Sequence, residues 1–143
     1  MWTLVRRVFK RRQSDTGGYC LQTVCRIHAS DAATIDRLYD VLHDDHRSWS
    51  KENEAGGYRT AITISESDIF DDHLIAMVGI LEQIDLFQTQ QGMVIEGLHF
   101  DTAVWTHRMP TSIVGKCLIL DIATIKRLAE SCATYETTVY HTG

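Results

Sequence analysis

The chain has little proline and no long apolar run. Of its 143 residues one is proline, Pro110, which lies in the turn-like segment "HRMPTS". No stretch approaches the roughly 18 consecutive apolar residues that a membrane-spanning helix requires, so a transmembrane helix is excluded. With 44% hydrophobic and 23% charged residues, the composition is that of one soluble globular domain.

Cysteine is also sparse, and it forms no metal or redox motif. The four cysteines include no CxxC pair, and the odd spacing of Cys20 and Cys25 puts them on opposite faces of a strand. We therefore expect reduced, mostly buried thiols, a cytoplasmic location and no cofactor.

Common catalytic motifs are missing as well. The sequence has no phosphate-binding glycine loop, no GxSxG and no HExxH. One arrangement stays open, in which Cys20, Cys25 or Cys117 is a nucleophile and His28 or His99 is its base. The residue types favour a binding protein over an enzyme.

Positive charge is scarce outside the N-terminal segment. The chain has a net charge of −5, yet "MWTLVRRVFKRRQ" carries five basic residues and no acid, and the rest of the chain has a net charge of −10. We treat residues 1–18 as a basic arm, which either packs as an edge strand or short helix or contacts an anionic surface. Residues 19–143 form a single domain whose acidity disfavours nucleic acid and favours a basic protein partner, unless it only maintains solubility.

Hydrophobic periodicity predicts the order β-α-β-α-β-β-α-β. The expected strands are 19–28, 58–65, 93–105, 115–121 and 134–141, and the expected helices are 32–42, 68–91 and a third that begins after Asp121. Residues 43–57, "HDDHRSWSKENEAGG", are expected to form a loop. Three amphipathic helices against strands buried on one face indicate an α+β fold with a mostly antiparallel sheet.

Particular residues are expected to cap the helices or to face the core. Ser30 or Asp31, then Asp68, then Asp121 are the expected N-caps, and Gly92 follows the end of the longest helix. The third helix is expected to bury Ile125, Leu128, Ala129 and Cys132, and the first strand to turn Gln22, Arg26 and His28 away from the core.

The sequence contains two nearly identical six-residue segments. "ATIDRL" at residues 33–38 and "ATIKRL" at residues 123–128 agree in five of six positions, and each follows an apolar, strand-like run. Two related strand-helix-strand units would pair as a ferredoxin-like arrangement. We favour a shared structural role as the explanation of the similarity, and common descent stays open.

The second half of the chain carries a resemblance. The succession "DDHLIAMVGILEQI", a strand pair ending near Trp105, "LILDIATIKRLAES" and "TTVYH" resembles a family of small uncharacterised bacterial proteins. Members of that family occur among the immunity proteins encoded beside polymorphic secreted toxins, such as Rhs, contact-dependent and type VI toxins. The resemblance implies a protein that binds its cognate toxin, covers the active site or target-binding surface, and needs no catalytic group or cofactor.

Two segments are candidate toxin-binding sites. "ESDIFDD" gathers acids at a helix start, where they either complement the helix dipole or meet a basic cleft of the toxin. In "HDDHRSW" an aromatic anchor stands among acids, whereas its His-x-x-His pair lacks the further ligand that a metal site needs. The candidate residues are Asp44, Asp45, Trp49, Glu66, Asp68, Asp71 and Asp72. The alternative function is a small-molecule-binding or regulatory ferredoxin-like module; the oligomeric state and the toxin's chemistry stay open.

Overall fold

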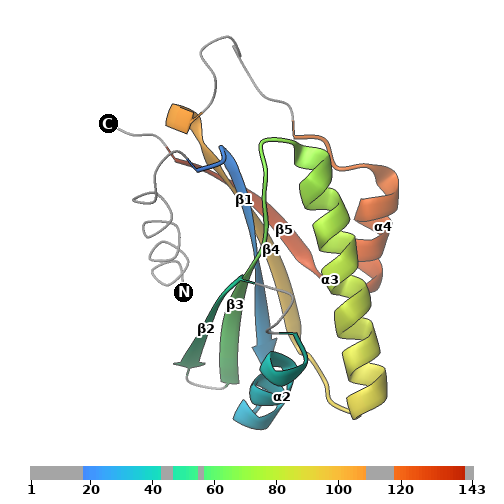
Figure 1. The fold of residues 1–143 in the computed structure, drawn as a ribbon. Helices are drawn as coiled ribbons and strands as arrows, with labels where there is room; N and C mark the ends of the chain where they lie inside the picture. Colours follow the sequence, from blue (N-terminus) through green and yellow to red (C-terminus); the bar gives the residue numbers. More distant parts are fainter. Residues whose placement is uncertain (1–17, 43–46, 55–56, 109–117, 141–143) are drawn as a thin grey trace.

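The computed structural model (Figure 1) describes residues 18–42, 47–54, 57–108 and 118–140, and for residues 47–54 and 57 only the backbone is described. The basic arm, apart from Gly18, lies outside the described residues. The elements, in chain order, are β1 (Leu21–Ala29), α2 (Ala32–Leu42), β2 (Arg47–Glu54), β3 (Gly57–Glu66), α3 (Phe70–Gln91), β4 (Gly97–Trp105), the 3-10 helix η1 (Thr106–Arg108), α4 (Ile122–Glu130) and β5 (Thr134–Tyr140).

The strands form one five-stranded sheet in the order β2-β3-β1-β4-β5. The pairs β2–β3, β3–β1 and β1–β4 are antiparallel, and β4–β5 is parallel, so the sheet is mixed. Three helices on a mostly antiparallel sheet confirm the predicted α+β class. Among the described residues, no helix is both long enough and apolar enough to cross a membrane.

The main core lies between the helices and one face of the sheet, which we call the helix face (Figure 1). It receives Leu38 from α2, Met77 from α3 and Leu128 from α4, which pack with Ile27 of β1 and Phe100 of β4. These side chains recur at helical or alternating spacing, which turns one side of each element inward. Burial of this apolar surface is the main force that holds the layers together.

Both copies of the short repeat begin their helices in the same way. Asp31 accepts a hydrogen bond from the backbone N–H of Thr34 at 2.8 Å, and Asp121 accepts one from the backbone N–H of Thr124 at 2.7 Å. These bonds satisfy amide groups that a helix start leaves unpaired. Hydrogen bonds from the backbone and side chain of Thr34 lower the pKa of Asp31, and those from the side chain and backbone of Thr124 lower the pKa of Asp121. The similarity therefore reflects at least a shared capping role.

The two copies do not lie in equivalent units. β4 and β5, which precede and follow α4 in the chain, pair in parallel. By contrast, β1, which precedes α2, pairs antiparallel with β3. Residues 118–121, the described part of the strand expected at 115–121, form no strand.

Three other expectations were wrong. Residues 47–54 form strand β2 rather than part of a loop, because they pair with β3 at the edge of the sheet. The N-cap of α3 is Ile69, with no side-chain capping bond, rather than Asp68. Ile125 and Ala129 of α4 and Cys132 beyond its end are exposed, and Thr124 joins Leu128 in the interior, because the helix presents a narrower face to the sheet than the apolar pattern indicated.

Candidate functional site

The second face of the sheet, opposite the helix face, is built around buried polar side chains. Gln22 and Arg26 of β1 and Asp101 of β4 are 3%, 7% and 0% exposed. The expectation that β1 is buried on only one face was wrong, because Val24 packs on this face with Ala103 and Trp105 of β4 in a second apolar cluster. Neither side-chain polar atom of Gln22 has a hydrogen-bond partner among the described residues. Buried polar groups are normally paired, so this face is a natural place to look for function.

Four of the polar side chains form a continuous chain of contacts. Arg26 Nη2 donates to Glu136 Oε1 at 2.7 Å, and His99 Nε2 lies 2.5 Å from the same oxygen. The other ring nitrogen, His99 Nδ1, lies 2.5 Å from Thr134 Oγ1. His99 is directly opposite Thr134 in the parallel β4–β5 pair, and Glu136 is two residues further along, so strand register brings the three together.

Asp101 lies behind this chain of contacts. Its Oδ1 accepts a hydrogen bond from Thr138 Oγ1 at 2.9 Å, and its Oδ2 is 3.9 Å from Arg26 Nη2. Burial raises the pKa of Asp101 above its ordinary value, and the Thr138 hydrogen bond opposes that change. Arg26 is thus placed between two carboxyl groups, which orient its guanidinium group.

A hollow of about 440 Å³ opens beside these residues at the end of the sheet where β1 ends and β4 and β5 begin. Its volume is in the range of small-molecule sites. The cationic or ionisable lining residues are Arg26, Arg59, His28 and His99. Ile27 and Leu98 also border the hollow, but they belong to the core on the helix face. Glu136, Thr134 and Cys132 complete the charged and nucleophilic part of the lining.

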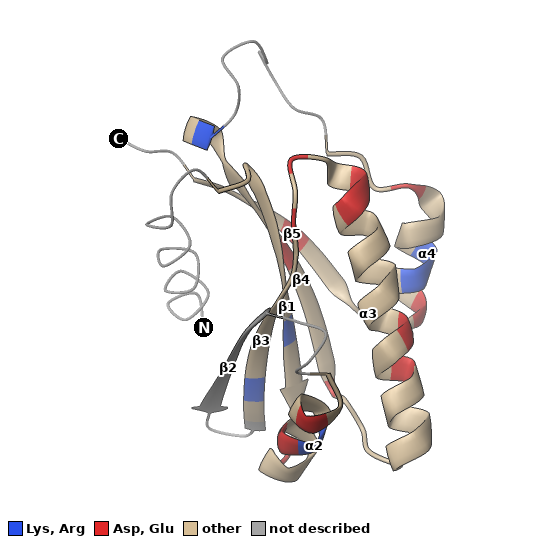
Figure 2. Ribbon diagram, in the orientation of Figure 1, with Lys and Arg blue, Asp and Glu red and all other residues tan. Residues whose placement is uncertain are grey.

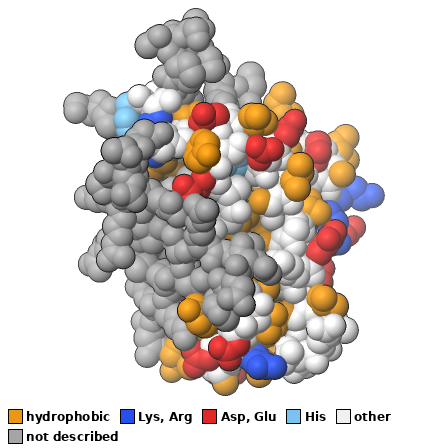
Figure 3. Space-filling model, viewed as in Figure 1, with side chains coloured by type: hydrophobic (Ala, Val, Ile, Leu, Met, Phe, Trp, Pro, Cys, Tyr) orange, Lys and Arg blue, Asp and Glu red, His pale blue; other side chains and the backbone are white. Residues whose placement is uncertain are grey.

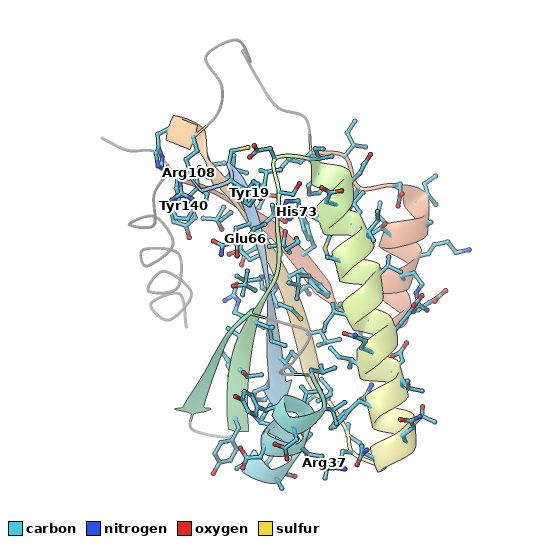
Figure 4. All side chains as sticks on the ribbon, in the orientation of Figure 1. Tyr19, Arg37, Glu66, His73, Arg108 and Tyr140 are labelled. Carbon is cyan, nitrogen blue, oxygen red and sulfur yellow. The ribbon has the colours of Figure 1, made fainter. Side chains whose placement is uncertain are left out.

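A second polar group lies on the helix face at the start of α3. The His73 side chain, labelled in Figure 4, is fully buried. Its Nδ1 lies 2.8 Å from Thr23 Oγ1 and 2.5 Å from Ser65 Oγ, and its Nε2 is 2.9 Å from the backbone oxygen of Ser67. The carbonyl requires an N–H donor, so Nε2 carries the proton and Nδ1 accepts from a hydroxyl group. Because both ring nitrogens are engaged away from any described cavity, this histidine has a structural role.

Acidic and apolar side chains alternate where α3 begins. Asp71 and Asp72 lie in the first turn of α3, after the exposed Asp68, and Figure 2 shows acidic residues at this end of the helix. Between and after them, Ile69 and Ile75 are 61% and 72% exposed. Asp68, Ile69, Asp71, Asp72 and Ile75 are called the α3 entrance surface below, and Figure 3 shows hydrophobic and acidic side chains intermixed over this part of α3.

The candidate acids of "ESDIFDD" differ in what they contact. Asp68 Oδ1 accepts from the backbone N–H of Cys20 at 2.7 Å, and Asp72 Oδ2 accepts from Ser67 Oγ at 2.5 Å. Asp71 makes no hydrogen bond or ion pair with the described part of the chain. Glu66 ends β3 and is half-buried. Asp68 and Asp72 thus have local structural partners, whereas Asp71 is the acid best placed to meet another molecule.

The other candidate segment lies elsewhere in the molecule. Asp44 and Asp45 are outside the described residues, as are His43 and His46. Trp49 lies on β2, where its backbone is opposite Ile62 of β3 rather than in a loop, and its side chain is not described. No described contact brings Trp49 to the acids of the α3 entrance surface.

An aromatic cluster stands at the opposite end of β4 from the hollow. Trp105 stacks on Tyr140 with ring centroids 4.3 Å apart, and the guanidinium carbon of Arg108 is 5.0 Å from the centre of a Trp105 ring. Arg108 Nη1 donates to the backbone oxygen of Tyr19 at 3.3 Å, and Figure 4 shows Tyr19, Arg108 and Tyr140 gathered at this end. Burial lowers the pKa of Arg108. These contacts lock the start of β1 against the end of β4.

The cysteine–histidine pairs that the sequence left open are not assembled on the described residues. Cys20 and Cys25 are buried in the core on the helix face, whereas His28 and His99 line the hollow on the second face. Burial also raises the pKa of the Cys25 thiol, which disfavours the nucleophilic thiolate. Cys117 lies outside the described residues. Within the described ranges, no three His, Cys, Asp or Glu side chains are close enough to hold a metal ion.

Comparison of the chain with protein-family models, with characterised proteins and with solved structures gives no match. Any assignment of function therefore depends on the residues themselves.

The chain of contacts at the hollow was not recognised from the sequence as a site. Thr134 and Glu136 read as ordinary residues of a terminal strand, and His99 was considered only as a base for cysteine. The signal of this site is a spacing of two residues within each strand. It places His99 and Asp101 on one face of β4, and Thr134, Glu136 and Thr138 on one face of β5. It could be read only once the parallel register of β4 and β5 was known.

Proposed function

We propose that this chain is a cytoplasmic immunity protein that binds a cognate antibacterial toxin domain of a polymorphic toxin system and neutralises it by covering its active site or target-binding surface. The observation that carries the proposal is the α3 entrance surface, where Ile69 and Ile75 are 61% and 72% exposed next to exposed acids.

Apolar anchors and charge have different roles in such an interface. Two isoleucines that bury their exposed area supply affinity, because a few well-packed side chains dominate binding energy. Helix α3 carries four acids and no lysine or arginine, so it presents one sign of charge. Surrounding acids accelerate association with a basic protein and disfavour acidic competitors. A toxin that acts on nucleic acid or on a phosphorylated nucleotide would carry such a basic cleft.

A stripe along α3 extends this surface. Asp71, Ile75, Glu82 and Asp85 are exposed and recur three, four or seven residues apart, which places them on one side of the helix. Asp85 Oδ2 lies 3.7 Å from Arg127 Nη2 of α4, so the stripe borders α4. A basic partner that lies along α3 can therefore contact acids over most of the length of the helix.

The test is a rescue experiment in bacteria. The C-terminal domain encoded by the adjacent upstream open reading frame is expressed with and without this chain. We expect toxicity to disappear on co-expression and the two proteins to purify together. Toxicity that persists while this chain is folded and abundant would contradict the proposal.

Variants then test the surface. Ile75→Asp is expected to weaken binding by at least about thirtyfold, as loss of a central apolar anchor does. Asp71→Lys is expected to slow association, most strongly at low salt. The matched control is Asp40→Lys on α2, an equally exposed acid at the other end of the molecule in Figure 1. If Asp40→Lys weakens binding as much as Asp71→Lys does, overall charge rather than the α3 entrance surface attracts the partner.

The hollow on the second face favours one other function, that of a small-molecule-binding or regulatory module. Its volume of about 440 Å³ suits a metabolite-sized ligand. This alternative would be supported by a metabolite that raises the melting temperature of the purified chain, if Ile75→Asp leaves that increase unchanged.

A further inference from the structure

The hollow on the second face holds a hydroxyl group, an imidazole ring and a carboxylate in succession. Thr134 Oγ1 lies 2.5 Å from His99 Nδ1, and His99 Nε2 lies 2.5 Å from Glu136 Oε1. All three side chains line the hollow, and that of Thr134 is exposed. This is the spatial order that activates a hydroxyl nucleophile: the nucleophile contacts a base, and a third group orients the base.

The proton positions follow from the chemistry of the partners. An ionised carboxylate only accepts hydrogen bonds, so Glu136 requires the proton of His99 on Nε2. Nδ1 then has a lone pair, and the Thr134 hydroxyl donates to it. The other acceptor near this hydroxyl, the backbone oxygen of Leu98, is 3.5 Å away and competes weakly.

Arg26 holds the carboxylate in place. Its Nη2 donates to the same Glu136 oxygen at 2.7 Å, and Arg26 is only 7% exposed. This charge-assisted hydrogen bond fixes the position of the carboxylate next to His99. Arg26 and Glu136 are therefore positioning residues, whereas Thr134 and His99 would contact the reacting atoms.

We propose that this hollow is an acyl-transfer site that hydrolyses carboxylic esters with small acyl groups, with Thr134 as the nucleophile and His99 as the general base. The volume of the hollow, about 440 Å³, suits an ester with a short acyl chain. Arg59 and His28 line the same hollow and carry N–H groups of the kind that stabilise a negatively charged carbonyl oxygen.

The reaction proceeds in two steps. Thr134 Oγ1 forms a bond to the ester carbonyl carbon while its proton passes to His99 Nδ1. The bond to the leaving alkoxide then breaks, the alkoxide takes that proton, and an acyl group remains on Thr134. In the second step a water molecule gives a proton to His99 and attacks the acyl carbon. The carboxylic acid leaves, and the threonine hydroxyl regains its proton.

The test uses p-nitrophenyl acetate and p-nitrophenyl butyrate with the full-length chain. We expect release of p-nitrophenolate and, after rapid quenching, a mass increase of one acyl group on the peptide that contains Thr134. Thr134→Val, which keeps the shape of the side chain, is expected to lower kcat at least roughly tenfold and to abolish the adduct. Thr134→Ser is expected to retain both.

A further variant serves as the control. Thr137→Val removes an exposed hydroxyl group from the same strand, at a residue that does not line the hollow. It is expected to leave kcat and the adduct unchanged. Glu136→Gln is expected to lower kcat more than it raises KM, because it keeps the size of the side chain in the lining and disturbs mainly the orientation of the base.

Clear outcomes would overturn the proposal. If folded Thr134→Val hydrolyses both esters as fast as the parent chain, the hydroxyl is not the nucleophile. If the acyl group is found on Cys132 or on another residue, the observed hydrolysis comes from a different site. Parent protein that releases no p-nitrophenolate above the rate in buffer would equally reject the site.

Discussion

The carboxylate of Asp68 accepts a hydrogen bond from the backbone N–H of Cys20 at 2.7 Å, across 48 residues of sequence. The bond ties the residue before β1 to the segment that leads into α3, and so joins the central strand to the longest helix. Asp68 was expected to cap α3, yet it stabilises a contact between two distant parts of the chain.

Removal of this bond is expected to destabilise the fold. Asp68→Ala should lower the free energy of unfolding by about 1 kcal/mol, because the Cys20 amide loses its acceptor. Asp68→Asn keeps an acceptor oxygen and should lose less. Urea denaturation measures both, with Asp71→Ala as the control, because Asp71 has no bond to the described residues. Equal losses in Asp68→Ala and Asp71→Ala would indicate that local charge, and not the bond, matters.

The two glycines of the α3 region are expected to respond in opposite ways to alanine. Gly92 ends the helix with φ of 63° and donates its N–H to Gln88, so a side chain there is strained. Gly92→Ala should therefore lower the free energy of unfolding by about 1 kcal/mol. Gly79 lies in the helix interior, and outside the helix's own backbone no described atom is within 4 Å of the place that a methyl group would take. Gly79→Ala should raise stability by about 0.5–1 kcal/mol, since alanine loses less backbone entropy.

Thermal unfolding of the Gly79→Ala and Gly92→Ala variants, with the double variant as a check on additivity, measures these effects. The two sites are more than three turns of helix apart, so their effects should add. A destabilised Gly79→Ala would mean that the open space beside this glycine is needed for packing.

The buried histidine is expected to be essential for stability. His73→Ala removes a fully buried ring and the one Nδ1 acceptor that the hydroxyl groups of Thr23 and Ser65 approach, so we expect a loss of about 3 kcal/mol. Ile75→Ala, an exposed position on the same helix, should change stability by no more than about 0.5 kcal/mol. Chemical denaturation with a linear extrapolation measures the difference. A His73→Ala variant as stable as the parent would show that its bonds contribute little net energy.

The buried carboxyl group of Asp101 is expected to make the stability of the fold depend on pH. Burial raises its pKa above the ordinary value of 3.8, so the folded chain binds the proton more tightly than the unfolded chain does. The ionised carboxyl therefore destabilises the fold above its raised pKa, and this effect disappears as pH falls below the unfolded value. Asp101→Asn keeps an acceptor for Thr138 and removes the charge.

We expect Asp101→Asn to melt at a higher temperature than the parent at pH 8, and the difference to shrink as pH falls towards 4. Melting curves across this interval measure it. A variant that melts lower at pH 8 would show that attraction to Arg26, 3.9 Å away, outweighs the cost of burial.

Local signals in the sequence predicted much of the fold. The Asp–x–x–Thr pattern at Asp31 and at Asp121 marks helix starts because capping is a contact between residues three apart. Gly92 marks a helix end for an equally local reason. Alternation in β1 and β4 identified strands, although it could not show that β1 is buried on both faces, which depends on the strands beside it.

The two candidate sites differ in the same way, since one is formed by residues close together in the sequence and the other by residues far apart. The acids and isoleucines of the α3 entrance surface are close together in the sequence, so their grouping on one helix start was visible without a structure. By contrast, Thr134 and His99 are 35 residues apart, and Glu136 and Arg26 are 110 residues apart. The sequence alone therefore determined the α+β class, the capping residues of α2 and α4 and the acidic helix start, because these depend on neighbouring residues and on periodicity. Only the tertiary structure decided that a hydroxyl, an imidazole and a carboxylate meet beside a hollow, because the pairing and register of strands come from packing of the whole sheet.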